Sequence, residues 1–176
     1  MKRIPLGVAI GFSWMMFAPF LFSEWEFGYW ATTPAELVTQ FSVQPSRALL
    51  TWFGLAFQGN FLETVATLVR AGPTLTTLYS SFFLSEVLFA SAMAWVSTGV
   101  LAGTFAGGRK RGLGTALLVF LLFLLTWLLL NVFAGEDLAL IFSYYLFPTL
   151  DNVLTAFLFS ALGGLIGGTI APAPGE

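Results

Sequence analysis

The chain has 176 residues, of which 57% are hydrophobic and only 9% charged, and its net charge is -2. With a mean hydropathy of +0.87, this composition excludes an ordinary water-soluble domain and predicts an integral membrane protein. The sparse charge offers no basic surface for nucleic acid. Because Cys and His are absent, disulfides, imidazole chemistry and the usual ligands of most metals are excluded, and we expect no cofactor and no metal site.

The first apolar run covers residues 4–23 and follows the basic pair Lys2 and Arg3. It contains the roughly 20 residues that a helix needs to cross the hydrocarbon core of a bilayer. A signal peptide is the alternative interpretation. We favour an uncleaved first transmembrane helix, because the run is longer than a typical signal-peptide core and no small-residue cleavage site stands out before Glu24.

Residues 24–80 differ in character, with more charges, several Pro and Gly, and apolar segments too short to span. We predict an outer helical subdomain. Residues 45–58 form an apolar helix of a few turns, and residues 60–71 form an amphipathic helix with its apolar side chains on one stripe. The helix at residues 45–58 is expected to lie at the membrane surface or against the bundle, and the helix at residues 60–71 to lie flat at the interface. The alternative is that residues 45–71 enter the membrane as a hairpin that lines a pore.

Three further apolar segments complete the predicted bundle, at residues 81–107, 113–134 and 150–171. The Leu-rich segment 113–134 is expected to face lipid. Between the last two segments, an apolar stretch that ends at Pro148 predicts a short interfacial helix. The predicted fold is therefore all-α and polytopic, a single membrane domain with about four transmembrane helices and short interfacial helices between the first two.

Orientation follows from the basic residues, because cytoplasmic loops are enriched in Lys and Arg. Four spans with the N-terminus inside place five of the seven basic residues on one side: Lys2, Arg3, Arg109, Lys110 and Arg111. We therefore predict a cell-membrane protein with both termini in the cytoplasm. Aromatic residues suited to the membrane interface are expected to act as anchors. They are Trp25, Trp30, Trp52, Tyr144 and Tyr145.

Small residues recur at every fourth position on two of the predicted spans. They are Gly99, Gly103 and Gly107 on the second span, and Ser160, Gly164 and Gly168 on the fourth. This spacing lets helix backbones approach closely and is typical of helix association in lipid. Two interpretations are open: the faces pack the chain's own bundle, which we favour, or they contact another subunit.

Two acidic residues fall within predicted spans, Glu86 and Asp151. Ionisable groups inside a membrane are costly and often mark ion or substrate paths. Both lie near the outer ends of their helices, where a carboxylate is also stabilised by the helix dipole and by free backbone amides. We therefore favour capping or solvation at the interface, and keep a proton, cation or subunit-binding role as the alternative.

Function can be constrained mainly by what is missing. The chain lacks G-x-S-x-G, the phosphate-binding G-x-x-x-x-G-K-[ST] and H-E-x-x-H, so we predict no enzyme. The leading hypothesis is a non-catalytic structural or accessory subunit of a larger membrane complex, which associates with other subunits or with itself through the glycine faces and the aromatic outer subdomain. The alternative is a small transporter or channel component, with Glu86 and the 45–71 hairpin along the path.

Overall fold

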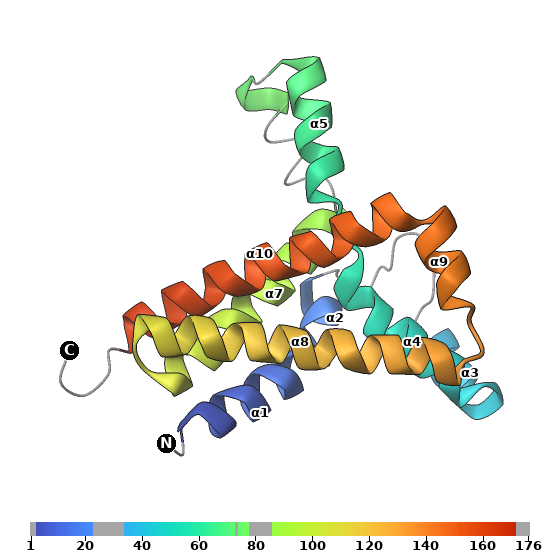
Figure 1. Cartoon of the computed structure of the whole chain (residues 1–176), viewed down its shortest axis with the longest axis horizontal. Helices are drawn as coiled ribbons and strands as arrows, with labels where there is room; N and C mark the ends of the chain where they lie inside the picture. The colour runs from blue at the N-terminus through green and yellow to red at the C-terminus, as the bar shows by residue number, and fades with distance from the viewer. Residues whose placement is uncertain (1–2, 23–33, 73, 78–85, 172–176) are drawn as a thin grey trace.

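The computed structural model describes residues 3–22, 34–72, 74–77 and 86–171, and the regular elements in these ranges are all helices (Figure 1). In chain order they include α1 (Arg3–Met15), α2 (Ala18–Phe22), α3 (Pro34–Val43), α4 (Pro45–Gly54), η1 (Leu55–Phe57), α5 (Phe61–Ala71), α7 (Glu86–Ala106), α8 (Arg109–Phe133), α9 (Leu138–Tyr144) and α10 (Leu146–Ile170). The predicted all-α fold is confirmed for this part of the chain. Three helices, α7, α8 and α10, are long and apolar enough to cross a membrane, as expected of a multi-pass membrane protein.

The bundle is built on these three helices, which lie side by side (Figure 1). Only Gly107 and Gly108 separate α7 from α8, and both have positive φ values, 69° and 85°. Glycine adopts this left-handed conformation at little cost, so the chain reverses within two residues. The amide of Gly108 also donates to the carbonyl of Ala171 at 2.7 Å. This bond holds the C-terminal end of α10 beside the turn.

The outward surface of the bundle is apolar, as expected of helices that contact hydrocarbon. Large exposed side chains include Leu118, Leu121, Leu122, Leu125 and Leu129 on α8, and Phe157, Leu158, Leu162 and Ile166 on α10. A contiguous apolar surface of this kind is unfavourable in water. The distribution of these side chains therefore agrees with the predicted lipid-facing role of residues 113–134.

The continuous helix predicted over residues 4–23 is wrong, because α1 ends at Met15 and α2 begins at Ala18. Pro19 explains the interruption: it has no N–H for the carbonyl of Met15, and its ring would collide with that carbonyl in an unbroken helix. At about 1.5 Å per residue, α1 is only about 20 Å long, short of a hydrocarbon core of about 30 Å. At the break, the indole of Trp52 donates to the carbonyl of Met16 at 2.7 Å.

The structure places residues 45–58 against the bundle, one of the two positions expected for this segment. Phe53 of α4 stacks on Phe123 of α8 with a centroid distance of 4.6 Å, and all three residues of η1 are buried. Phe123 is about 21 Å along α8 at 1.5 Å per residue, which is near its middle. The segment therefore inserts between the spanning helices, because its large aromatic side chains are buried more completely there than at an interface.

Helix α5 has a different relation to the bundle. Figure 1 shows it projecting away from α10, across the direction of the spanning helices. Only Thr64 and Leu68 of this helix are buried, while Leu62 and Val69 are exposed by 49% and 74%. We call α5 the arm of the molecule.

The two ends of the bundle differ in charge. The start of α1, the α7–α8 turn and the end of α10 meet at one end (Figure 1), which carries Arg3, Arg109, Lys110 and Arg111. The connection between α8 and α9, with Glu136 and Asp137, lies at the opposite end. Four of the five basic residues that the topology argument places on one side are described, and all four share this end.

Candidate functional site

The candidate site lies where the chain leaves the bundle core and begins the arm, at residues 55–63. The backbone of η1 is enclosed by protein, so its polar groups need partners there. The carbonyl of Ala56 accepts two hydrogen bonds from α7: from the indole of Trp95 at 2.7 Å and from the hydroxyl of Ser91 at 3.1 Å. These bonds compensate for burying an irregular segment among apolar helices.

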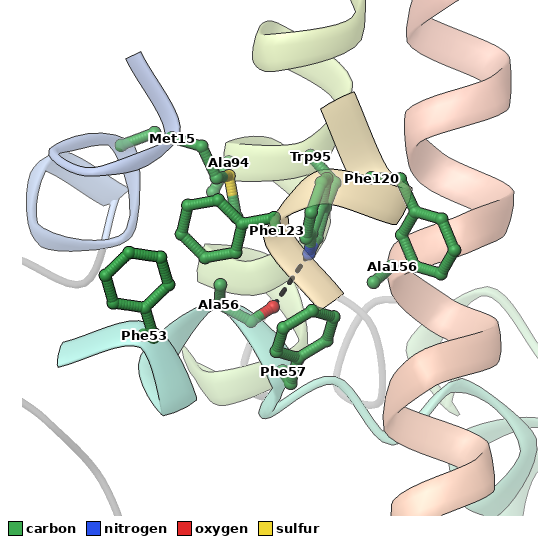
Figure 2. Close-up of a cluster of buried hydrophobic side chains, with 10 residues drawn as sticks. Met15, Phe53, Ala56, Phe57, Ala94, Trp95, Phe120, Phe123 and Ala156 are labelled. Atoms are coloured by element: carbon green, nitrogen blue, oxygen red, sulfur yellow. Dashed lines mark hydrogen bonds between the residues drawn. The ribbon is translucent and has the colours of Figure 1, made fainter. Parts of the chain in front are cut away.

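Aromatic side chains surround this carbonyl on the side of the bundle core. Figure 2 shows Trp95, Phe57, Phe120 and Phe123 gathered around the Trp95–Ala56 hydrogen bond. The ring of Trp95 lies 5.6 Å from that of Phe57, 5.7 Å from that of Phe120 and 5.8 Å from that of Phe123, measured between centroids. Offset and edge-on contacts at these distances are favourable. The cluster fills the space between η1, α7 and α8 with apolar rings.

On the opposite side, the carboxylate of Asp151 on α10 binds the first turn of the arm. One oxygen accepts the backbone N–H of Leu62 at 2.7 Å, and the other accepts that of Glu63 at 3.0 Å. Asp151 is only 7% exposed. The N-cap residue of α5 itself, Asn60, makes no capping bond with its side chain. Asp151 therefore caps a neighbouring helix in place of that helix's own N-cap residue.

Thr155, one turn further along α10, extends this cap. Its hydroxyl accepts the backbone N–H of Phe61 at 3.1 Å and donates to the carbonyl of Asp151 at 2.7 Å. The next amide, that of Thr64, bonds to the carbonyl of Asn60 at 3.0 Å and so begins the ladder within α5. The first four N–H groups of a helix normally lack intrahelical partners. Here α10 satisfies three of them, those of Phe61, Leu62 and Glu63.

Close approach of the two backbones depends on Gly59. A Cβ at this position would overlap the side chain of Thr155 and lie 3.2 Å from the hydroxyl oxygen of Ser91. Only glycine fits between α7 and α10 at this point. The site thus consists of two capping side chains on α10, those of Asp151 and Thr155, and two donors on α7, those of Ser91 and Trp95. The lack of a side chain at Gly59 lets the chain pass between them.

The charged groups of the site are the buried carboxylate of Asp151 and the N-terminus of α5 that it contacts. The partial positive charge of that N-terminus stabilises an anion. Within the described ranges, no three acidic side chains come together as a metal site requires. One polar atom, the Oδ1 of Asn60, is buried without a hydrogen-bond partner, while its Nδ2 donates to Glu63 at 3.3 Å. The bonds made by this group of residues suit anchoring of the arm.

Thr155→Val is expected to destabilise the protein by about 1 kcal/mol more than Thr169→Val. Both hydroxyls donate to a carbonyl four residues earlier at 2.7 Å, but only Thr155 also accepts an amide of the arm. Unfolding in detergent micelles by added SDS, followed by the fluorescence of the six Trp residues, measures the difference. Equal losses in the two variants would contradict this account of the cap.

The predicted glycine faces lie inside the chain. A Cβ at Gly99 would be 2.5 Å from the carbonyl oxygen of Ser160, and one at Gly103 would be 2.6 Å from that of Gly164. Gly168 meets the backbone of Gly108, in the turn before α8, and of Arg109, its first residue. The hydroxyl of Ser160 donates to the carbonyl of Ala116 on α8 at 3.1 Å. The remaining member, Gly107, forms the α7–α8 turn.

These contacts are those of the interpretation favoured from the sequence, in which the faces pack the chain's own bundle. Backbone atoms of α7, α8 and α10 occupy the faces, so the subunit contact proposed below is placed on the arm instead. The spacing alone could not reveal this, because the same pattern permits close approach within a chain and between chains.

The other predicted site residues have varied positions. Glu86 is the first residue of α7, and its side chain lies outside the described part of the molecule, as do Trp25 and Trp30. Trp52 is partly buried and makes the internal hydrogen bond to Met16. Tyr144, the last residue of α9, and Tyr145, the N-cap residue of α10, are largely exposed. Asp151 is thus the predicted polar residue that the structure places in a defined site.

The comparisons with known proteins do not assign the chain: no family model, no curated protein and no solved structure matches it.

Proposed function

We propose that the chain is a non-catalytic accessory or structural subunit of a larger membrane protein complex, in which the bundle presents the arm to a neighbouring subunit. The observation that carries this proposal is the anchoring of the arm. A buried carboxylate, a buried hydroxyl and a glycine contact hold the first turn of α5. The side chains of Leu62, in that turn, and of Val69, near the far end of the helix, remain exposed. An anchored helix that stands away from its own bundle and exposes apolar side chains suits a contact with another protein.

The use of buried polar side chains supports a structural role. Ser91, Thr115, Asn131 and Ser160 each donate to a backbone carbonyl, and Thr98 bonds to the sulfur of Met15. Groups that handle a solute need free donors or acceptors. Those in the bundle contribute to packing instead.

The transport alternative has one observation in its favour, the buried carboxylate of Asp151. Both of its oxygens are engaged by the arm, and the hairpin expected to line a path places Phe53 and Phe57 in the core. The subunit hypothesis therefore accounts for more of the described contacts.

We further propose that the chain crosses the cell membrane four times, with α1 and α2 together forming the first crossing. Support comes from the course of α1 along α7: Gly7 meets Ala102, and Met15 meets Thr98. The chain begins at the basic end and must reach the opposite end before α7 starts. With the basic end inside, both termini face the cytoplasm.

The subunit proposal predicts that the chain purified from its native membrane in mild detergent has a mass above the 19.1 kDa of one copy. The double variant Leu62→Ser/Val69→Ser is expected to lower the assembled fraction about tenfold, equivalent to about 1.4 kcal/mol. Native mass spectrometry measures it. Leu129→Ser/Val132→Ser is the matched control, because these α8 side chains are also exposed. A parent chain found only as a monomer contradicts the proposal.

A further inference from the structure

The basic end of the bundle carries positive charge from two separate elements. Arg3 begins α1, and Arg109, Lys110 and Arg111 form the first turn of α8; all four side chains are exposed. The guanidinium of Arg3 reaches the α7–α8 turn, where its Nη1 lies 3.7 Å from the position that a Cβ on Gly107 would take. We call these four residues the basic rim.

Acidic residues in the described part of the chain do not neutralise this rim. Glu136 and Asp137 lie at the opposite end of the bundle, Glu63 lies on the arm, and Asp151 is only the sixth residue of α10, whose last residues reach the rim. The first turn of α8 contains no acidic residue. Glu86 is the first residue of α7, whose last residues reach the rim, and Glu36 belongs to α3, which lies at the opposite end (Figure 1). No helix in the described ranges therefore brings an acidic residue to the basic end of the bundle.

The secondary structure increases this imbalance. The N-terminus of a helix carries partial positive charge, so cations in its first turn are unfavourable. Three consecutive basic residues occupy that turn in α8, and its N-cap Gly108 provides no side-chain acceptor. The C-terminal ends of α7 and α10 also lie at this end of the bundle and offset part of the charge. Each helix C-terminus carries only about half a negative charge, however, against four positive side chains. An external anion would relieve the repulsion.

The depth of the rim identifies the class of anion. Helix α8 has 25 residues, or about 37 Å at 1.5 Å per residue, against a hydrocarbon core of about 30 Å. Its first turn therefore lies at the level of the lipid headgroups. Anionic headgroups are the negative charges concentrated there, and juxtamembrane basic clusters attract them.

We propose that the basic rim is a binding surface for the headgroups of anionic phospholipids, with Arg3 and Arg109 to Arg111 contacting the phosphate. This goes beyond the subunit hypothesis, because the rim lies at the opposite end from the anchor of the arm. The competing explanation is that these charges serve only to orient the chain during insertion. Orientation requires positive charge but no selectivity for bound lipid, so lipid binding separates the two.

The test uses the purified full-length chain, exchanged into detergent with equimolar phosphatidylglycerol and phosphatidylcholine. Native mass spectrometry counts the lipids that remain bound. We expect at least about tenfold enrichment of phosphatidylglycerol, falling as salt rises from about 50 mM to about 0.5 M. Equal retention of the two lipids by the parent chain overturns the proposal.

Variants locate the binding surface. Arg109→Gln/Lys110→Gln/Arg111→Gln is expected to abolish the enrichment, whereas the control Arg47→Gln/Arg70→Gln, which changes exposed basic residues outside the rim, keeps it. If the triple variant does not fold, Arg3→Gln and Arg111→Gln each should lower the enrichment about fivefold, since each basic residue contributes a similar increment. Unchanged enrichment in the rim variants, or an equal loss in the control, overturns the assignment.

Discussion

Asp151→Leu is expected to lower the free energy of unfolding by about 2–4 kcal/mol and to free the arm from the bundle. The substitution leaves the backbone amides of Leu62 and Glu63 without their acceptor in a buried site. Neither amide can bond to a carbonyl within α5, because the residues just before Phe61 are not helical. Asp151→Asn retains one acceptor oxygen and should lose about half as much.

Asp137 provides a matched control for this experiment. Its carboxylate also caps a helix, accepting the amides of Ala139 and Leu140 at 2.9 and 3.2 Å, but it is exposed and lies two to three residues away in sequence. Asp137→Leu should therefore cost only about 0.5–1 kcal/mol. The contrast isolates the effect of burial and of the long-range contact from that of capping itself.

The position of the arm can be measured independently of the stability of the protein. The chain has no cysteine, so spin labels at Val69→Cys and Leu158→Cys, both exposed sites, report one distance by pulsed electron paramagnetic resonance. We expect a narrow distribution in the parent chain and in Asp137→Leu, and a broad one in Asp151→Leu. An unchanged distribution in Asp151→Leu would show that the carboxylate does not hold the arm.

Gly167→Ala is expected to destabilise the bundle by about 2–4 kcal/mol, or to prevent folding. A Cβ there would overlap the carbonyl oxygen of Val100 and lie 2.9 Å from the amide nitrogen of Thr104. Both are backbone atoms of α7, so no side chain can rotate away and the two helices must separate. Thermal unfolding followed by Trp fluorescence detects the loss.

A change of glycine to alanine at Gly114 should instead leave the stability of the bundle unchanged or increase it. No atom lies within 4 Å of the position of a Cβ there, and alanine is favoured over glycine inside a helix by about 0.5–1 kcal/mol. Gly114→Ala is therefore expected to leave the melting temperature unchanged or raise it. If Gly167→Ala melts at the same temperature as Gly114→Ala, the close contact of α7 and α10 is not present in solution.

Patterns within short segments were sufficient to predict much of the fold. Long apolar runs predicted α7, α8 and α10, and apolar residues that recur every three to four positions predicted α5. The break at Pro19 could also have been predicted from the sequence, because proline has no N–H to bond the carbonyl four residues earlier. A count of apolar residues over 4–23 misses the break, since hydropathy does not depend on the backbone N–H.

Local sequence patterns predicted only part of the candidate site. Capping was the favoured interpretation of Asp151, since its position near the start of a helix suggested free amides nearby. The helix that it caps is another one, and the bonded amides lie 89 and 88 residues away along the chain. No local pattern carries that information, because it depends on how closely α5 approaches α10 at Gly59.

Membrane residence, the spanning helices and the basic end thus follow from hydropathy, periodicity and charge, which act through solvent and through neighbours a few residues apart. Three features required the tertiary structure: the insertion of η1 beneath Trp95, the capping of the arm by Asp151, and the glycine contacts of α7 with α10. Each depends on backbones that meet across long stretches of sequence. A glycine or a carboxylate permits such a contact, but the packing of the whole bundle selects which partner it meets.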